Sequence, residues 1–237
     1  APPRWLRFSV PVRVPDGRPM LAIVIDDMGV DRRRSGRVMS LKGPLTLSFL
    51  TYADDLDRQT REAADAGHEL MLHVAMAPRN ERLDAGPNVL ESGLDPTELR
   101  RRLAWGLARF GTFVGINNHM GSQFTADAEG MRVVMETLRD RGLLFLDSRT
   151  TADTVGARVA HEVGVPVVER NVFLDNVNTE KAVRARLDEA IAIARKRGYA
   201  VAIGHPRDAT IAVLSDWLGR AADEGIAVVP VTAVVKR

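Results

Sequence analysis

The chain has 237 residues, of which 45% are hydrophobic, so it can build one sizeable core in a single domain or two small ones. Its 33 Lys and Arg nearly balance its 31 Asp and Glu, and the charges are spread along the chain, which argues against nucleic acid as a partner. The absence of cysteine excludes disulfides and thiolate metal sites, and no apolar run reaches the roughly 18 residues of a transmembrane segment.

Residues 1–19 contain five prolines and no regular hydrophobic period, so we expect an extended N-terminal arm or linker there. From Met20 onward, apolar runs typical of strands alternate with helical patterns. One domain is therefore expected over residues 20–237. The strands are predicted at 21–25, 45–50, 69–72, 112–116, 143–146, 165–168, 200–204 and 226–229. The helices are predicted at 31–40, 55–66, 96–109, 127–141, 180–197 and 208–223, with a weaker one at 152–162.

Helix boundary signals support this alternation. Asp95-Pro96 and Thr179-Glu180 are typical helix starts, and several glycines follow predicted helices directly before an apolar strand. A regular strand–helix rhythm of this kind predicts an α/β fold with a parallel sheet closed, or nearly closed, into a (β/α) barrel. A doubly wound open sheet remains the alternative.

Five of the predicted strands end in Asp or His. They are LAIVIDD, HELMLH, FVGINNH, LLFLDS and YAVAIGH. The carboxyl ends of parallel strands lie together, so these side chains should converge on one pocket. Two adjacent aspartates and several histidines in that pocket indicate a divalent metal and hydrolytic chemistry.

Asp26 and Asp27 follow the first strand directly. Neighbouring strand residues point to opposite sides, so one carboxylate could hold a metal while the other accepts protons. A helix cap is the structural alternative for one of them. His73 lies at the carboxyl end of the third strand and is a better ligand candidate than His68, which follows a helix stop. The long loop at 74–93 is expected to form part of a binding site.

Polar residues also follow the next two strands. His119 is a further ligand candidate, and Asn118 and Ser122 beside it are candidates for substrate binding or for support of the ligands. Asp147 could orient a histidine or a ligand, and Arg149 could bind an anion, with Ser148 between them. An ion pair and a helix cap are equally good interpretations of that segment.

Two later strand ends complete the set. Arg170 and Asp175 lie in RNVFLDN and are candidates for substrate contact. His205, held by Pro206, is a candidate general acid, since the ordinary pKa of histidine is about 6.5. None of the three tryptophans falls at a strand end, so the sequence shows no aromatic surface on which a sugar ring could stack.

With these residues the chain resembles the divergent polysaccharide deacetylases, a branch of the NodB-like deacetylases of carbohydrate esterase family 4. IDDMG resembles the first family motif, GHELMLH the second and IGHP the last. The resemblance implies Asp26 as catalytic base, Asp27 and His73 as metal ligands and His205 as the group that protonates the leaving amine. The usual second histidine of the second motif is Ala77 here, so His119 could supply the missing ligand.

The resemblance further implies a distorted barrel of about seven parallel strands, a divalent ion such as Zn²⁺ and a periplasmic or cell-envelope location. The leading hypothesis is a metal-dependent hydrolase that removes N-acetyl groups from an envelope glycan. The alternative is a catalytically inactive barrel that binds a glycan or a protein, which the substitution at Ala77 favours. Hydrolysis of another amide or ester, such as a peptide cross-link, is a third possibility.

Overall fold

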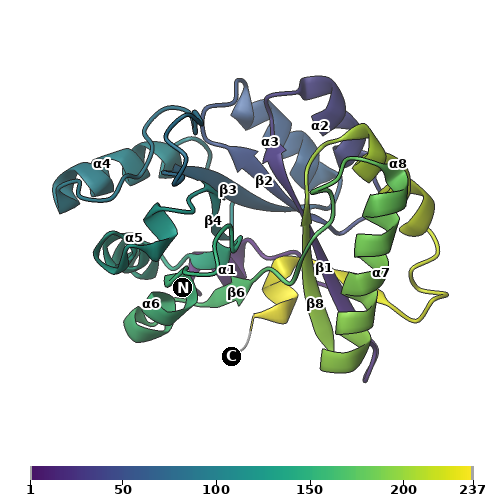
Figure 1. Cartoon of the computed structure of the whole chain (residues 1–237). Helices are drawn as coiled ribbons and strands as arrows, with labels where there is room; N and C mark the ends of the chain where they lie inside the picture. Colours follow the sequence, from purple (N-terminus) through teal and green to yellow (C-terminus); the bar gives the residue numbers. More distant parts are fainter. Residues whose placement is uncertain (1, 236–237) are drawn as a thin grey trace.

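The computed structural model of the protein describes residues 2–235, and Figure 1 shows a central sheet flanked by helices. The strands are β1 (Met20–Met28), β2 (Thr46–Leu50), β3 (Glu69–Met76), β4 (Gly115–Met120), β5 (Leu144–Asp147), β6 (Val167–Glu169), β7 (Val172–Phe173), β8 (Tyr199–Gly204) and β9 (Ala227–Val229). The α-helices are α1 (Arg4–Arg7), α2 (Arg32–Met39), α3 (Leu56–Asp65), α4 (Pro96–Leu107), α5 (Ala128–Asp140), α6 (Gly156–Val163), α7 (Glu180–Arg197) and α8 (Asp208–Trp217), with short 3-10 helices η1 (Phe124–Ala126) and η2 (Val231–Val234).

The strands form one sheet in the order β6-β5-β4-β3-β2-β1-β8-β7, with β9 paired to β1. Every pairing between these strands is parallel, which confirms the predicted distorted (β/α) barrel. The sheet has more strands than the seven expected, because the two-residue β7 and the short β9 also pair. The two ends of the strand order, β6 and β7, are not paired with each other. We call this open side of the barrel the seam; β6 borders it on one side, and β7 with the amino-terminal part of β8 borders it on the other.

Local signals position the helices close to where they are predicted. Asp95 accepts a hydrogen bond from the Thr97 amide at the start of α4, and Thr179 does the same for Ala182 at the start of α7. Gly198 ends α7 with φ of 87°. α8 is shorter than the predicted 208–223, because the chain turns after Trp217. Within residues 2–235, no helix combines the length and apolarity that crossing a membrane requires.

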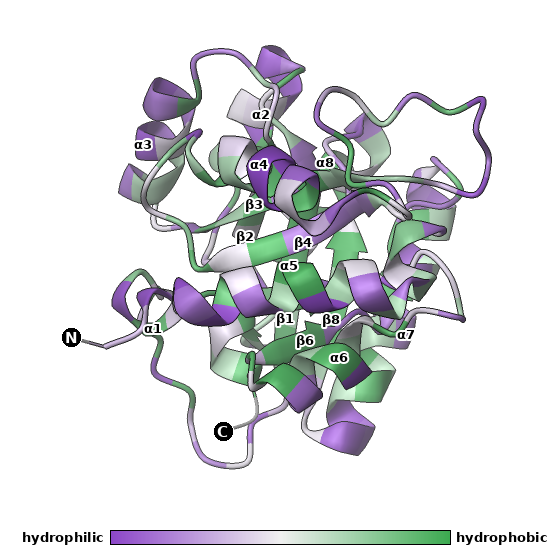
Figure 2. Ribbon diagram, turned by 90° about the vertical axis from the view of Figure 1, so that its left-hand side faces the viewer, coloured by the Kyte–Doolittle hydropathy of each residue, from purple (hydrophilic) through white to green (hydrophobic). Residues whose placement is uncertain are grey.

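The strands separate two apolar layers. The outer layer joins the sheet to the helices, and Figure 2 shows these helices with hydrophobic and hydrophilic faces. The inner layer fills the barrel with strand residues such as Val24, Met71, Leu146, Val201 and Ile203. Because side chains alternate along a strand, the same strands can continue this inner face with polar groups toward their carboxyl ends.

The N-terminal arm, predicted as an extended arm or linker over residues 1–19, includes a short helix and packs on the barrel over its described residues 2–19. It contains α1, whose Trp5 amide donates a hydrogen bond to the Gly142 carbonyl over 2.9 Å. Trp5, Phe8, Val12 and Val14 pack against the inner layer of the barrel. Hydrophobic residues between the prolines therefore attach the arm to the amino end of the sheet, where η2 also packs.

A buried carboxylate links these two segments to the sheet. Oε1 of Glu69 accepts hydrogen bonds from Thr46 Oγ1 and the Thr232 amide, both over 3.2 Å. Its Oε2 accepts from the Val10 amide over 3.4 Å and from Thr232 Oγ1. Burial raises the pKa of Glu69 to about 7, although these donors act in the opposite direction. We refer to Glu69 and its partners Val10, Thr46 and Thr232 as the amino-end cluster.

Candidate metal centre and active site

A β-bulge in β1 explains how two consecutive aspartates face one site. The register of β1 against β2 shifts between Ile25 and Met28, and Asp27 has a positive φ of 55°. A bulge re-aims a side chain that would otherwise point to the opposite face of the sheet. Asp26 and Asp27 consequently both lie near Nε2 of His73, at 3.6 Å and 3.3 Å. The bulge therefore lets both neighbouring aspartates face the same site.

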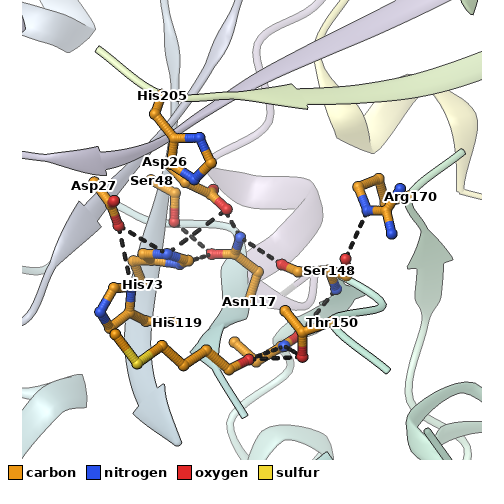
Figure 3. Close-up of polar contacts among 12 residues, drawn as sticks. Asp26, Asp27, Ser48, His73, Asn117, His119, Ser148, Thr150, Arg170 and His205 are labelled. Carbon is orange, nitrogen blue, oxygen red and sulfur yellow. Dashed lines mark hydrogen bonds and ion pairs between the residues drawn. The ribbon is translucent and has the colours of Figure 1, made fainter. Parts of the chain in front are cut away.

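The three predicted metal ligands converge. One oxygen of Asp27 and one ring nitrogen from each of His73 and His119 all lie within 4.8 Å of one another. Asp27 Oδ1 is 3.3 Å from His73 Nε2 and 3.1 Å from His119 Nδ1. The two imidazole rings meet edge to face with their centroids 4.9 Å apart. Figure 3 shows both rings directed toward the Asp27 carboxylate. β3 and β4 are longer than predicted, so both histidines lie within strands.

The donor set fits a divalent cation. Oδ1 of Asp27 is buried but has no hydrogen-bond partner among the described residues, although two ring nitrogens lie beside it. A buried polar atom without a partner is unfavourable, and a shared cation would satisfy it. Two imidazoles and one carboxylate are a common ligand set of catalytic zinc sites, which keep a further position open. Burial alone would raise the pKa of Asp27, but His119 and His73 hold it well below its ordinary range, so this ligand stays ionised.

Asn117 orients the ligand and the base together. Its Oδ1 accepts from Ser48 Oγ over 2.5 Å and from His73 Nδ1 over 2.9 Å, and its Nδ2 donates to Asp26 Oδ1 over 2.8 Å and to Ser148 Oγ over 3.1 Å. An amide oxygen only accepts, so His73 must carry its proton on Nδ1. Nε2 of a neutral His73 is then left as a lone pair facing the two aspartates. The fully buried Asn117 thus fixes the tautomer that a metal ligand needs.

Asp26 has the environment of a general base. Its side chain is only 3% exposed, and burial raises its pKa above the ordinary value, while His73 and His205 act against that shift. A raised pKa makes a carboxylate a better proton acceptor near neutrality. Burial alone would lower the pKa of His73, but the charges of Asp26 and Asp27 raise it to about 9, so a cation that binds at neutral pH displaces the Nε2 proton of the metal-free ring.

His205 lies on the Asp26 side of the site, just beyond β8 (Figure 3). Its Nδ1 donates to Asp175 Oδ1 over 2.8 Å, and its backbone amide donates to Asp175 Oδ2 over 2.7 Å. Thr210 Oγ1 donates to the same Oδ2 over 2.7 Å. Burial would lower the pKa of His205, but Asp175 raises it above the ordinary value. Asp175, predicted as a substrate contact or supporting residue, is therefore the buried partner of His205.

Other predicted residues lie outside the pocket. Asn118 ties β4 to the next strand end, since it accepts from the Ser148 amide over 2.9 Å and donates to the Met120 carbonyl over 2.8 Å. Ser122 accepts from the Arg79 amide over 3.0 Å and links two loops. Asp147 faces α6, where Thr154 Oγ1 donates to it over 2.7 Å, so it supports this strand end and not the mouth of the barrel.

Ser148, Arg149 and Arg170 form the side of the mouth next to the seam. Ser148 Oγ accepts from Asn117, and Arg149 forms an ion pair with Glu169 over 2.5 Å. Arg170 donates to the carbonyl of Ser148 over 2.7 Å and to that of Arg149 over 2.8 Å. These residues were predicted at strand ends, but their spacing does not reveal that the carbonyls of Ser148 and Arg149 accept from Arg170.

Three residues near the site were not predicted from the sequence. Ser48 supports Asn117 from β2, a strand without an Asp or His at its end. Phe173 stacks on His205 with centroids 6.3 Å apart and lies beneath the Arg170 guanidinium. Tyr52 follows β2, and its pKa is raised by burial and by the negative charges of Asp27 and Asp84. Thr46 and Ser48 are two residues apart in β2, so strand alternation could have predicted that both face the inside of the barrel. Phe173 and Tyr52, unlike the tryptophans, lie near strand ends.

Comparison with known proteins shows the family to which the chain belongs. The family model described as divergent polysaccharide deacetylase matches residues 23–235, so the chain belongs to that family. It is 36% identical over 198 residues to the uncharacterized protein YibQ of Escherichia coli strain K12, a match that covers 84% of this chain. The matched region spans only 62% of YibQ.

Two solved structures are similar to this one. The uncharacterized protein ATU2773 from Agrobacterium tumefaciens C58 superposes with a TM-score of 0.95 at 28% identity, over 98% of this chain and 95% of that one. The catalytic domain of peptidoglycan N-acetylglucosamine deacetylase from Eubacterium rectale ATCC 33656 has a TM-score of 0.57 at 13% identity, over 94% of each chain. The second likeness shows the shared fold alone.

Proposed function

We propose that this protein is a metal-dependent hydrolase that removes N-acetyl groups from a glycan of the cell envelope. One observation carries the proposal. Ring nitrogens of His73 and His119 lie beside Oδ1 of Asp27, a buried carboxylate oxygen that has no hydrogen-bond partner among the described residues. A base and an acid, Asp26 and His205, lie around the same point. A module that only binds a glycan has no need of such a pair.

Asp27, His73 and His119 would hold the ion, and Zn²⁺ suits two imidazoles and a carboxylate. When bound, such an ion polarises the acetamide carbonyl and lowers the pKa of a water molecule toward about 7. The usual second histidine of the motif, at whose position this chain has Ala77, is not needed for a set of three ligands. His119 comes from β4, the strand next to β3, and supplies the third ligand.

Asp26 accepts the proton of the attacking water as the oxygen adds to the carbonyl carbon. Its Oδ1 is held by Asn117 Nδ2 over 2.8 Å, so the carboxylate is fixed before substrate binds. Burial, which raises its pKa, favours this proton transfer. The products of the complete reaction are acetate and a free amine on the sugar.

His205 donates a proton to the nitrogen as the carbon–nitrogen bond breaks. The hydrogen bond from its Nδ1 to Asp175 leaves Nε2 as the nitrogen available to the site. Asp175 also raises the pKa of His205, which keeps the ring protonated closer to neutral pH. Asp175 acts through His205 and is therefore a positioning residue.

The experiment combines metal analysis with acetate release from chitooligosaccharides and peptidoglycan fragments. The wild type should contain about one ion per chain and release acetate. Asp26→Asn should keep the ion and lose about 100- to 10,000-fold in turnover, the usual range for general acid–base catalysis. Bound metal with no acetate release from any substrate would contradict the enzymatic proposal and favour a binding role. Fractionation of the full-length protein from its native cell tests the proposed envelope location.

A further inference from the structure

The seam contains a cavity of about 680 Å³, a size typical of small-molecule sites. It runs along the unpaired side of β6, over residues Val167–Asn171, toward Tyr199 of β8, and α6 and α7 flank it. In Figure 1 these two helices lie on either side of the strands that border the seam. The cavity reaches the mouth of the barrel, since Arg149 and Arg170 line it.

The lining of the seam cavity is cationic. It includes Arg149, Arg170 and Arg197, whereas Glu169 is its one acidic residue. Glu169 is already paired with Arg149. Among the described residues 2–235, no carboxylate forms an ion pair with Arg170 or Arg197. Two guanidinium groups therefore face the cavity without a direct ion-pair partner in this part of the chain.

Arg170 is the less solvated of the two. It is partly buried, its Cζ lies 3.7 Å from the Phe173 ring centroid, and its donors contact only backbone carbonyls. Burial is the largest of the effects that lower its pKa to about 10; Arg149 and Arg186 act in the same direction, whereas the carboxylates of Asp147 and Asp26 act in the opposite one. A partly buried cation without a direct ion-pair partner is unfavourable, and an anionic oxygen beside it would reduce that penalty.

Arg170 is also connected to the proposed reaction centre through a chain of hydrogen bonds. Its Nε donates to the Ser148 carbonyl, and Ser148 Oγ accepts from Asn117, which holds Asp26 (Figure 3). On its other side, the Phe173 ring separates Arg170 from His205. A group bound at Arg170 would thus be attached to a substrate whose reacting acetamide lies between Asp26 and His205.

We propose that the seam cavity is a subsite for an anionic substituent, so that the substrate is an N-acetylated glycan carrying a carboxylate or a phosphate close to the scissile acetamide. This inference rests on the proposed deacetylase function. Arg170 binds the anionic oxygens at the mouth, and Arg197 extends the positive charge along the cavity. The planar guanidinium suits both carboxylate and phosphate.

Three related sugars test the proposal with the metal-loaded full chain. N-acetylglucosamine is neutral, N-acetylmuramic acid carries a carboxylate, and N-acetylglucosamine 6-phosphate carries a phosphate. NMR titration should show at least one anionic sugar binding about tenfold more tightly than the neutral one, as a charge-assisted hydrogen bond provides. The advantage should shrink in high salt. Whichever anionic sugar binds more tightly identifies the source of the charge. Equal affinity for all three would overturn the proposal.

Variants locate the effect. Arg170→Gln removes the charge but keeps donors for the two carbonyls. Arg197→Ala changes an exposed side chain on α7, so the fold should be kept. Arg170→Gln, at the mouth, should reduce the ratio of anionic to neutral affinity strongly, and Arg197→Ala, at the amino end of β8, should reduce it less. Arg184→Ala, also on α7 but outside the cavity lining, is the matched control and should keep the ratio. An unchanged ratio in both cavity variants would contradict the assignment.

The two proposals fail in different ways. If anionic sugars bind more tightly through Arg170 but no sugar polymer releases acetate, the subsite stands and the deacetylase function fails. If acetate is released equally well from neutral and anionic substrates, and the cavity variants do not alter that ratio, the function stands and the subsite fails.

Discussion

The barrel contains two buried carboxylate clusters, one at each end, and they differ in how completely their oxygens are satisfied. At the amino end, both oxygens of Glu69 accept hydrogen bonds from fixed donors. At the carboxyl end, Oδ1 of Asp27 has no hydrogen-bond partner among the described residues, although two imidazole nitrogens lie within 3.3 Å of it. The same strands β2 and β3 supply residues to both clusters.

This difference separates a structural role from a functional one. The amino-end cluster joins the N-terminal arm and η2 to the sheet, and it leaves no ligand atom free for a cation. The carboxyl-end cluster leaves ligand atoms of Asp27, His73 and His119 directed at one point. In (β/α) barrels, active-site residues lie at the carboxyl ends of the strands, whereas residues at the amino ends contribute to stability.

The largest expected effect is loss of metal when a ligand is removed. Asp27→Ala or His73→Ala should lower the affinity for Zn²⁺ by more than the roughly 100-fold that changes in residues around the ligands cause. Isothermal titration of the metal-free protein measures this. Asp54→Ala, which removes an exposed carboxylate beyond β2, is the control and should bind as the wild type does. Wild-type affinity in both ligand variants would show that the ion, if any, binds elsewhere.

The amino-end cluster should affect stability and its pH dependence instead. The pKa of Glu69 is raised from 4.5 to about 7 in the folded protein, so its contribution to stability is fully present below about pH 4.5 and is lost as the pH rises through 7. Above that pH the charged carboxylate lowers the free energy of unfolding by up to about 3 kcal/mol. Glu69→Gln, which cannot ionise, should therefore gain stability relative to the wild type between pH 5 and pH 8.

Urea unfolding of both metal-free proteins at several pH values measures this gain, and zinc affinity at pH 7 is the second readout. A constant difference in unfolding free energy across the pH range would refute the assigned pKa. A fall in zinc affinity would break the distinction between the two clusters.

A smaller effect is expected at Asn117. Asn117→Ala leaves the Nδ1 proton of His73 and one oxygen of Asp26 without their buried partner, so the ring and carboxylate lose their orientation. Zinc affinity should fall about 10- to 100-fold, as for other partners of metal-bound histidines. In the metal-free protein above pH 9, where the His73 ring is neutral, its nitrogen resonances report its tautomer. Asn178→Ala, at an exposed position before α7, is the control. An unchanged tautomer in Asn117→Ala would contradict the role given to this amide.

Much of the fold follows from local sequence signals. The alternation of apolar runs with helices that begin at Asp95 or Thr179 predicted the parallel barrel and the strand ends that carry Asp27, His73, His119 and His205. The arm was predicted less well. Its prolines suggested an extended tether, but the apolar residues between them pack on the inner layer, which depends on tertiary contacts.

The details of the site depend on geometry that spacing alone does not reveal. The bulge at Asp27 results from a register shift between two strands, and it decides that both aspartates face one histidine. Asp147 lies at a strand end like the other candidates, but strand alternation points it toward α6. The four hydrogen bonds of Asn117 join residues from four separate segments, which no local pattern in the sequence encodes.

The most direct test is the coordination of the bound ion. X-ray absorption at the zinc edge, together with anomalous diffraction from crystals of the metal-loaded protein, locates the ion and identifies its neighbours. The account predicts one ion bonded at about 2.0–2.2 Å to Asp27 Oδ1, His73 Nε2 and His119 Nδ1. An ion bound elsewhere in the chain, or a site that stays empty at saturating zinc, would contradict it.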